Sequence, residues 1–231
     1  MNGGEMKIWK YEINRANLNE KTLQINAGFS ANQYTERLIE QPFIYRNIHN
    51  PPASVLDIGC WESVVSIQLA MLGYRVTGID IQNYGYIHPN FDFIHDDFNK
   101  HDFGTEKFDI ITNISAIEHF GLLTYTNANR DDNADKKAIA KIKQLLKPKG
   151  QFLFTAPFGV HGEVENFERI YDMNDIMSMF QGFKILQMKT YLVANYRYIQ
   201  EIPIKEAEKI EHNEKKHSYA VVCINSEKTE R

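Results

Sequence analysis

Short apolar runs recur along the first two thirds of the chain, and each is separated from the next by turn residues or by a segment with helical spacing. The runs predict strands near residues 54–58, 75–79, 91–94, 108–113 and 150–155. The clearest helical patterns between them cover residues 63–72 and 134–146. Because strands that alternate with helices form parallel sheets covered on both faces, this pattern predicts an α/β fold.

The two ends of the chain differ from this middle part. Residues 34–44 have apolar positions at helical spacing, and Pro42 is expected to break or restart that helix. After a helix near 173–180, two strand patterns follow at 183–193 and 218–224 without a clear crossover helix between them. Such a connection favours an antiparallel strand pair at the edge of the sheet.

Length and composition limit the fold classes that fit. The chain has 231 residues, 43% of them hydrophobic and 24% charged, which is typical of a globular protein. We expect one domain over 1–231, with a helical lead-in at 1–50, a core at 51–160 and a C-terminal part at 161–231. No run approaches 18 apolar residues, and the N-terminal segment lacks the apolar stretch of a signal peptide.

The charge and the cysteines narrow the function classes. The formal net charge is −4 with acids and bases interspersed, which argues against a nucleic-acid-binding surface. Cys60 and Cys223 are the only cysteines and form no C-x-x-C pair, so neither a disulfide framework nor a zinc site is indicated. These features predict a cytoplasmic protein that acts neither on nucleic acid nor at a membrane.

The most informative pattern is a βαβ unit near the start of the core. Its first apolar run ends in Asp57-Ile58-Gly59, and its second ends in Asp80, 23 positions after Asp57. A glycine beyond the first strand allows a tight turn, and an acid at the tip of the second strand can accept hydrogen bonds from both hydroxyls of a ribose. The unit therefore predicts a site for a nucleoside-containing ligand, although a solvated acid at a strand end is the simpler alternative for Asp80.

This segment resembles the first motif of the class I S-adenosylmethionine-dependent methyltransferases. The family pattern often reads Asp-x-Gly-x-Gly-x-Gly, whereas this chain reads Asp57-Ile58-Gly59-Cys60-Trp61-Glu62-Ser63 and lacks two of the glycines. A subset of the family is similar in placing Glu-Ser here. Trp61 brings a large ring into the turn, and Ser63 is a candidate cap for the helix that follows.

Three later segments carry the same resemblance. Asp96-Asp97-Phe98 is similar to the motif in which an acid reaches the adenine amine; either aspartate fits, with the other as a helix cap, and we favour Asp96. Ser115-Ala116-Ile117-Glu118-His119 follows the fourth strand, as the family's Ser-x-x-Glu-His stretch does. Residues 145–155 are like the family's Leu-Lys-Pro-Gly-Gly turn and the strand after it.

The resemblance implies a fold and a cofactor. The implied fold is a Rossmann-like, doubly wound α/β sheet of seven strands, mostly parallel, with an antiparallel C-terminal strand pair. The implied cofactor is S-adenosyl-L-methionine, with S-adenosyl-L-homocysteine as its product. The residues expected to bind it, by their match to the family motifs, are Asp57, Gly59, Cys60, Trp61, Ser63, Asp80, Ile81, Asp96, Asp97, Phe98, Asn113 and Ser115.

Methyl transfer to a hydroxyl or an amine benefits from a base that removes the acceptor's proton. His119 is our candidate because an imidazole with an ordinary pKa near 6.5 suits this task, and a histidine that only bonds loop backbone is an equal alternative. Glu118 is expected to orient His119 or to contact the amino group of the cofactor. His161, Arg169 and Tyr171 are secondary candidates for contacting the acceptor.

The loop at 121–133 is long for its place and is expected to shape the acceptor pocket. Whether it or the 194–217 segment closes over that pocket is left open. Asp131, Asp132 and Asp135 match no calcium-loop spacing, so no metal site is predicted, and a role at the start of the next helix is favoured.

We therefore expect an S-adenosylmethionine-dependent methyltransferase that acts on a small polar acceptor. Similarity to a branch often associated with surface-glycan genes suggests a sugar or a glycan precursor. The alternative is a cofactor-binding regulatory or assembly module without catalysis, which the missing glycines favour. A nicotinamide dehydrogenase is disfavoured because Trp61 stands where a pyrophosphate must approach. The expected partner is a small-molecule substrate, and a homodimer is left open.

Overall fold

A mixed β-sheet organises the part of the chain that the structure describes. The structure is a computed structural model that describes residues 35–61, 63–123, 125, 129–195, 198–213 and 217–230, together with the backbone of two short strands. These strands, β1 (Gln24–Ile25) and β2 (Phe29–Ser30), pair antiparallel and lie outside the main sheet.

Five parallel strands form the half of the sheet that the apolar runs predicted. They are β3 (Ser54–Ile58), β4 (Arg75–Asp80), β5 (Phe91–His95), β6 (Phe108–Ile114) and β7 (Leu146–Phe158). Most side chains of β3 and β6 are buried on both faces of the sheet, which explains why these strands are continuous apolar runs in the sequence. Pairing is parallel from β5 through β4, β3 and β6 to β7, so their carboxyl ends lie along one edge.

Three C-terminal strands complete the sheet. They are β10 (Phe183–Ala194), β11 (Tyr198–Ile202) and β12 (Ser218–Lys228), and the order across the sheet is β11-β10-β12-β7-β6-β3-β4-β5. Strand β12 runs antiparallel to both of its neighbours, β7 and β10. The predicted mostly parallel sheet with an antiparallel C-terminal pair is therefore confirmed.

The expected count of seven strands is one too low. Strand β11 pairs antiparallel with β10 after a turn in which Asn195 has a φ of 55°. Only Ile199 and Ile202 of β11 pack against the buried clusters, while Tyr198 is half exposed and Gln200 and Glu201 are exposed. Two apolar side chains in a polar stretch give no apolar run, so the sequence pattern did not reveal this strand.

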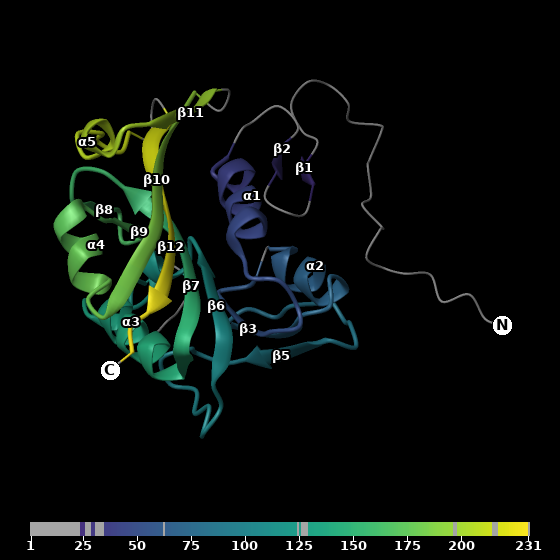
Figure 1. Cartoon of the computed structure of the whole chain (residues 1–231). Helices are drawn as coiled ribbons and strands as arrows, with labels where there is room; N and C mark the ends of the chain where they lie inside the picture. The colour runs from purple at the N-terminus through teal and green to yellow at the C-terminus, as the bar shows by residue number, and fades with distance from the viewer. Residues whose placement is uncertain are drawn as a thin grey trace.

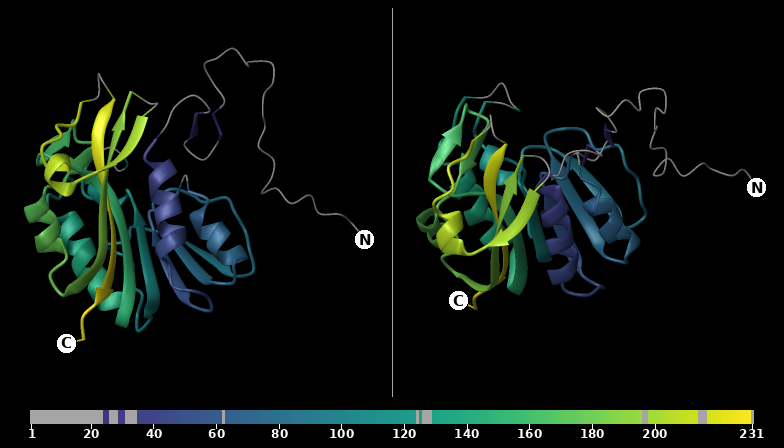
Figure 2. Two further views of the ribbon diagram at one scale, coloured as in Figure 1. Left: turned by 45° about the horizontal axis from the view of Figure 1, so that its top comes forward. Right: turned by 90° about the horizontal axis from the view of Figure 1, so that it is seen from above.

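Helices cover both faces of the sheet, which makes the fold doubly wound. Helices α1 (Arg37–Asn47) and α2 (Val65–Met71) lie on one face, and α3 (Ala134–Leu145) and α4 (Met173–Met179) lie on the other (Figures 1 and 2). None of the helices in the described residues has the length and apolar character needed to cross a membrane.

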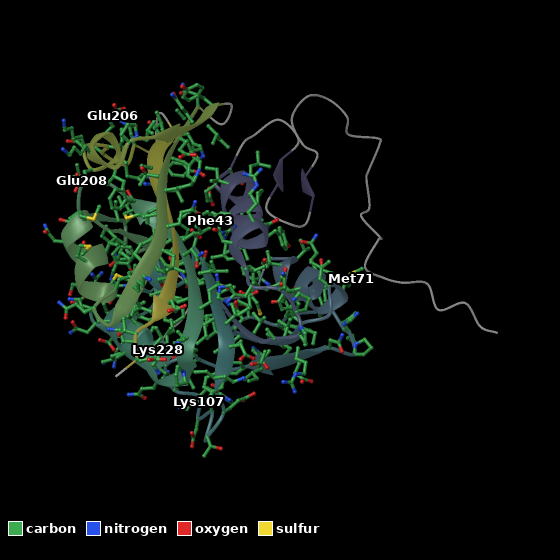
Figure 3. The ribbon with its side chains drawn as sticks, viewed as in Figure 1. Phe43, Met71, Lys107, Glu206, Glu208 and Lys228 are labelled. Atoms are coloured by element: carbon green, nitrogen blue, oxygen red, sulfur yellow. The ribbon has the colours of Figure 1, made fainter. Side chains whose placement is uncertain are left out.

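Helix α1 runs through Pro42 and is not broken or restarted there. A proline inside a helix leaves the carbonyl four residues earlier without its donor. Here that carbonyl belongs to Leu38, an exposed residue. Phe43 and Ile44, which follow the proline, are buried, and Phe43 lies between α1 and the sheet (Figure 3). Their packing against the sheet keeps the helix continuous.

Two apolar clusters hold the layers together. Between the sheet and α3 and α4, the rings of Phe152, Phe154, Phe180 and Phe183 contact one another with centroid separations of 5.5 to 5.8 Å. On the other face, α1 and α2 pack their apolar side chains against β3, β4 and β6. The central strands are therefore fixed from both sides.

Short elements gather at the carboxyl edge of the parallel strands. They are the 3-10 turn η3 (Ile117–His119), the hairpin of β8 (Gly162–Val164) and β9 (Glu168–Ile170), and α5 (Ile204–Ala207). Figure 3 shows the two ends of the sheet, with Glu206 and Glu208 near α5 at one end and Lys107 and Lys228 at the other. The Nζ of Lys228 donates to the carbonyl of Leu146, where β7 begins, at 2.8 Å.

Replacing Phe152 with alanine tests the aromatic cluster. Phe152 is fully buried against three other rings, so Phe152→Ala is expected to lower the free energy of unfolding by about 3–5 kcal/mol. Leu186→Ala, on an exposed position of β10, is the control and is expected to change it by less than about 0.5 kcal/mol. Denaturant unfolding curves measure both, and equal losses would contradict the proposed packing.

Candidate functional site

A cavity of about 570 Å³ lies at the carboxyl edge of the parallel strands. Its wall is formed by residues that follow β3, β4, β5 and β6, and by α1 and the start of α3. Strand β3 has β4 on one side and β6 on the other, so the strand order reverses at this point. Ligands of doubly wound sheets bind in the crevice at such a reversal.

Gly59 forms the floor of this cavity beyond β3. It has a φ of +70°, and its amide donates to the carbonyl of Ile79 at 2.9 Å. A Cβ at this position would lie 2.3 Å from the Cβ of Ala116, so a larger residue would push the two loops apart. Glycine is therefore required where the sequence pattern placed it.

Asp57 lies beneath the cavity and does not line it. Its carboxylate accepts hydrogen bonds from the hydroxyls of Ser66, at 2.5 Å, and Thr112, at 2.7 Å. Burial raises the pKa of Asp57 to about 6. Because its side chain is buried outside the cavity wall, Asp57 joins β3, β6 and α2 and does not face the expected ligand.

Two more residues of the first motif also lie outside the cavity wall. Cys60 is fully buried, and burial raises the pKa of its thiol. The Oγ of Ser63 accepts a hydrogen bond from the amide of Val65, the first residue of α2, at 3.1 Å, but the N-cap position itself is occupied by Val64, which has no side-chain cap. Trp61 does line the cavity and remains 38% exposed.

Asp80 faces the cavity from the tip of β4. Its Oδ2 accepts from the amide of Trp61 and its Oδ1 from the amide of Gln82, both at 2.8 Å. Burial raises its pKa. Each carboxylate oxygen can accept a further hydrogen bond, so the fixed carboxylate can bind two hydroxyls. Ile81 follows it in the wall.

The segment after β5 supplies Asp96, Asp97 and Phe98 to the cavity wall. The Oδ2 of Asp96 lies 2.9 Å from Nδ1 of His101, and this hydrogen bond lowers the pKa of Asp96. Asp97 caps the turn, because its Oδ1 accepts from the amide of Asn99 at 2.9 Å. The structure therefore brings both candidate acids to the cavity and gives the capping role to Asp97.

Lys141 of α3 anchors this segment, a contact that the sequence analysis missed. Its Nζ donates to the carbonyls of Phe98, at 2.6 Å, and His101, at 2.5 Å, and lies 5.1 Å from the centre of the Phe98 ring. The lysine is 40 or more positions away in sequence, so no local pattern pointed to it.

Asn113 and Ser115, at the end of β6, have different positions. Asn113 is buried outside the wall, where its Nδ2 donates to the carbonyl of Thr155 and its Oδ1 accepts from the amide of Ile117. Ser115 lines the cavity with a φ of 43°, and its hydroxyl donates to Glu40. Asn113 thus holds the loop that carries Ser115.

Arg37 and Glu40 of α1 are site residues that the sequence analysis did not identify. Arg37 lines the cavity, and its Nη1 donates to Glu40 at 2.7 Å and to the carbonyl of Ile114 at 3.3 Å. Glu40 is fully buried and also accepts from the hydroxyl of Thr155. The available signal was a glutamate among the apolar positions of the helix, because a buried charge requires a partner.

His119 lines the cavity at the end of η3. Its Nδ1 lies 2.5 Å from the carbonyl oxygen of Phe167, and burial lowers the pKa of the ring. A carbonyl accepts only, so Nδ1 carries the proton and Nε2 keeps its lone pair. The geometry fits a neutral base and also the backbone hydrogen bond that was the equal alternative.

Glu118 does not orient His119 in this structure. Its side chain is fully buried outside the cavity wall, and neither carboxylate oxygen has a hydrogen-bond partner among the other described residues. Burial raises its pKa well above the ordinary value, so it holds its proton at neutral pH. Successive residues of a 3-10 turn point about 120° apart, which separates Glu118 from the direction of His119.

The loop after η3 contributes Gly121, Leu122, Tyr125, Asn129 and Asp131 to the wall, as expected for 121–133. Residues 124 and 126–128 lie outside the described residues. None of the described residues in 194–217 lines this cavity.

The secondary acceptor candidates have other contacts. The Nδ1 of His161 lies 2.7 Å from the Oδ2 of Asp175. Tyr171 is buried, and its hydroxyl donates a hydrogen bond to the Oδ2 of Asp135 at 3.2 Å. Arg169 donates to backbone carbonyls, among them that of Phe120 at 2.6 Å. In the described part of the chain, His, Cys, Asp and Glu side chains form no group of three or more that could hold a metal ion.

Solved structures share this fold. The 1,6-didemethyltoxoflavin-N1-methyltransferase from Burkholderia thailandensis, with bound S-adenosylhomocysteine, matches at a TM-score of 0.54 and 16% identity over 83% of this chain and 77% of that chain. An S-adenosylmethionine-dependent methyltransferase from Methanosarcina mazei matches at a TM-score of 0.54 and 14% identity, over 82% of this chain and 98% of that chain. The [4+2]-cyclase SpnF matches at a TM-score of 0.58 and 14% identity, over 83% of this chain and 80% of that chain. The fold is therefore the class I methyltransferase fold.

A family described as Caenorhabditis protein of unknown function, DUF268, matches residues 82–223, which is more than half of the chain. The match begins just beyond Asp80, so it does not include the turn at Gly59. A search of the curated proteins finds no match.

The raised pKa of Asp57 predicts a pH dependence of stability. The folded protein holds this proton more tightly than the unfolded chain, so the stabilising contribution is complete below about pH 4 and is lost as the pH rises through about 6. Asp57→Asn removes this titration. As the pH rises from about 4 to about 6, the unfolding free energy of the unmutated protein is therefore expected to fall relative to that of Asp57→Asn. The expected change in this difference is on the order of 2–3 kcal/mol.

Denaturant unfolding at a series of pH values measures this difference. Asp92→Asn, on an exposed position of β5, is the control and is expected to leave the pH profile unchanged. A constant difference between Asp57→Asn and the unmutated protein across this range would contradict the raised pKa of Asp57.

Proposed function

The chain belongs to the family described as Caenorhabditis protein of unknown function, DUF268, and we propose that it is an S-adenosylmethionine-dependent methyltransferase acting on a small polar acceptor. The observation that carries this proposal is the pair formed by Gly59 and Asp80 at the strand reversal. Gly59 leaves the floor of the cavity free of a side chain, and the Asp80 carboxylate faces the same cavity. A ribose needs this combination of close backbone approach and a fixed carboxylate.

The other parts of the wall also fit the cofactor. Asp96 is an acceptor suited to the adenine amino group, and Phe98 offers an apolar surface beside it. Arg37 uses only Nη1 in hydrogen bonds among the described residues, so Nε and Nη2 can bind a carboxylate such as that of the methionine part. Trp61, in place of a glycine, stays in the wall and leaves room for a cavity of about 570 Å³.

The cofactor supplies an electrophilic methyl group, and the chain supplies position and a base. His119 is neutral at pH 7 because burial lowers its pKa, and its Nε2 is the nitrogen that can accept a proton. Removal of the acceptor's proton by such a base contributes roughly 10²–10⁴-fold in rate. The aromatic rings of Phe120 and Tyr125 in the wall help to exclude water from the reacting groups.

For the acceptor we propose a sugar or a glycan precursor as the first class to test. The wall offers hydrogen-bonding groups from Asn129, Asp131 and Lys137, and the ring of Tyr125 lies beside His119, with 5.2 Å between ring centroids. Polyhydroxy rings bind to such a mixture of polar groups and an aromatic surface. This is consistent with the glycan-associated branch that the sequence resembles.

Removal of the Asp80 carboxylate tests the cofactor site. We expect the unmutated protein to bind S-adenosylmethionine with a Kd in the micromolar range, roughly 1–100 μM, and Asp80→Ala to lose this binding. Isothermal titration calorimetry measures both, and thermal melting verifies that the variant is folded. Asp92→Ala is the matched control, because Asp92 is an exposed acid on the neighbouring strand that does not line the cavity. Absence of binding by the unmutated protein would overturn the assignment.

Replacement of His119 tests the base. His119→Gln is expected to lower kcat by about 10²–10⁴-fold while the Kd for S-adenosylmethionine stays the same. In the unmutated protein, kcat is expected to rise with pH through a pKa below the ordinary histidine value and then level off, because the base must be deprotonated. Transfer of a radiolabelled methyl group to a panel of sugars and polar metabolites provides the assay, with His49→Gln, at an exposed position, as the control.

The same assay separates the alternative of a binding module without catalysis. The observation that favours this alternative is the half-exposed Trp61 ring in the cavity wall. Cofactor binding with no transfer to any acceptor in the panel would support it. The similarity to a [4+2]-cyclase also shows that this fold is compatible with reactions other than methyl transfer.

A further inference from the structure

The β8–β9 hairpin determines which nitrogen of His119 carries the proton. Its turn has Glu165 and Asn166 in the left-handed region, with φ of 39° and 59°, and the amide of Phe167 donates to the carbonyl of Val164 at 2.6 Å. The amide of Phe167 is therefore used within the turn, whereas its carbonyl accepts from Nδ1 of His119 at 2.5 Å. The ring of Phe167 also packs on the imidazole, with 4.8 Å between centroids.

A hairpin this short is not stable by itself. Its strands have three residues each, and even longer isolated hairpins are marginal in water. Its position therefore depends on contacts with the rest of the chain. Two arginines are among them, one from β9 and one from the loop before α3, in addition to the buried side chain of Ile170.

Arg169 of β9 anchors the base of the hairpin from within. It is 12% exposed, and its guanidinium donates to the carbonyls of Glu118, at 3.1 Å, Phe120, at 2.6 Å, and Asp131, at 3.3 Å. These three carbonyls belong to η3 and to the loop before α3. Arg169 thus joins the hairpin to the backbone that carries His119.

Arg130 holds the tip of the hairpin from outside. Its Nη1 and Nη2 donate to the two carboxylate oxygens of Glu163, at 2.9 and 2.6 Å, and Nη1 also lies 2.5 Å from Oδ1 of Asn166 in the turn. Its Nε donates to Asp132 at 2.6 Å. An isolated exposed ion pair contributes little, but a bidentate fork that also reaches the turn fixes a geometry.

We propose that Arg130 is a positioning residue for His119: through Glu163 and Asn166 it fixes the hairpin so that the Phe167 carbonyl holds the proton on Nδ1 and leaves Nε2 as the base. This inference rests on the proposed function for its catalytic consequence, although the fixed tautomer is a property of the protein alone. Arg130 itself is not part of the described cavity wall, so the cofactor site is not expected to depend on it.

The spectroscopic test uses the full chain without ligands. Long-range ¹⁵N–¹H spectra report which ring nitrogen of His119 carries the proton, and comparison with His119→Gln assigns its signals. We expect the Nδ1–H form in the unmutated protein and a mixture of both tautomers in Arg130→Gln. Arg75→Gln, an exposed arginine at the other end of the sheet, is the matched control and is expected to keep the Nδ1–H form.

The kinetic test uses the methyl-transfer assay. Arg130→Gln is expected to lower kcat by about 10- to 100-fold, since small displacements of a reacting group have effects of this size, with the Kd for S-adenosylmethionine unchanged. Arg130→Lys keeps the charge but loses the fork, so it is expected to restore only part of the rate. Glu163→Gln and Asn166→Ala remove one side of the contact each, and serve if Arg130→Gln does not fold.

The outcomes separate this inference from the proposed function. A fixed Nδ1–H tautomer in folded Arg130→Gln, or in both Glu163→Gln and Asn166→Ala, would overturn the role of Arg130. Loss of the fixed tautomer in these variants supports it even if no acceptor in the panel is methylated, a result that would count against the proposed function alone. Equal losses of cofactor binding and rate would mean that Arg130 only stabilises the fold, and would also overturn the inference.

Discussion

One buried carboxylate links the carboxyl ends of the paired strands β3 and β6 to helix α2, directly beneath the turn that forms the cavity floor. Asp57 of β3 accepts from Thr112 of β6 and from Ser66 of α2, which fixes the two strands and the helix at the strand reversal. Directly beyond it, Gly59 lies against Ala116 with no space for a Cβ. The loops that follow β3 and β6 are therefore in close contact at Gly59 and Ala116, and the cavity floor lies at this contact. A buried carboxylate has an energetic cost, and its two hydroxyl partners reduce that cost without removing it.

Much of the fold could be predicted because the parallel strands are buried on both faces. The run at 54–58 matches β3 residue for residue, since every inward and outward position is apolar or internally satisfied. The features that were missed depend on partners distant in sequence. Strand β11 forms because β10 offers an edge, and α1 continues through Pro42 because the sheet packs on Phe43 and Ile44. Neither cause is visible within a short window of sequence.

The sequence motifs predicted where the candidate site lies in the fold better than they predicted which side chains face the cavity. The motifs placed Gly59, Asp80 and His119 at the strand tips, and the structure brings all three into one wall. Asp57 and Asn113 belong to the same motifs but face the interior, where they brace the loops that carry the wall residues. A motif gives the distance along the chain, whereas alternation within a strand decides which side chain reaches the cavity. Arg37 was missed because Glu40, its partner in the same helix, is buried only through contacts with distant residues, and its other partner, the carbonyl of Ile114, lies at the end of a distant strand.

The charges of the wall connect the proposed cofactor with the neutral base. Lys100 and Lys137 are each paired with an aspartate of the wall, Asp97 and Asp131, and Arg37 is paired with Glu40. Asp80 has no cationic side chain among its hydrogen-bond partners, so the cofactor end of the cavity favours a positive ligand such as a sulfonium. A protonated histidine nearby would oppose such a ligand, and burial of His119 prevents this by lowering its pKa. Methyl transfer removes the positive charge of the ligand, so the attraction to this end of the cavity is weaker after the reaction than before it. In the proposed reaction, the same arrangement favours binding of the charged cofactor, keeps the proposed base unprotonated and weakens the binding of the neutral product.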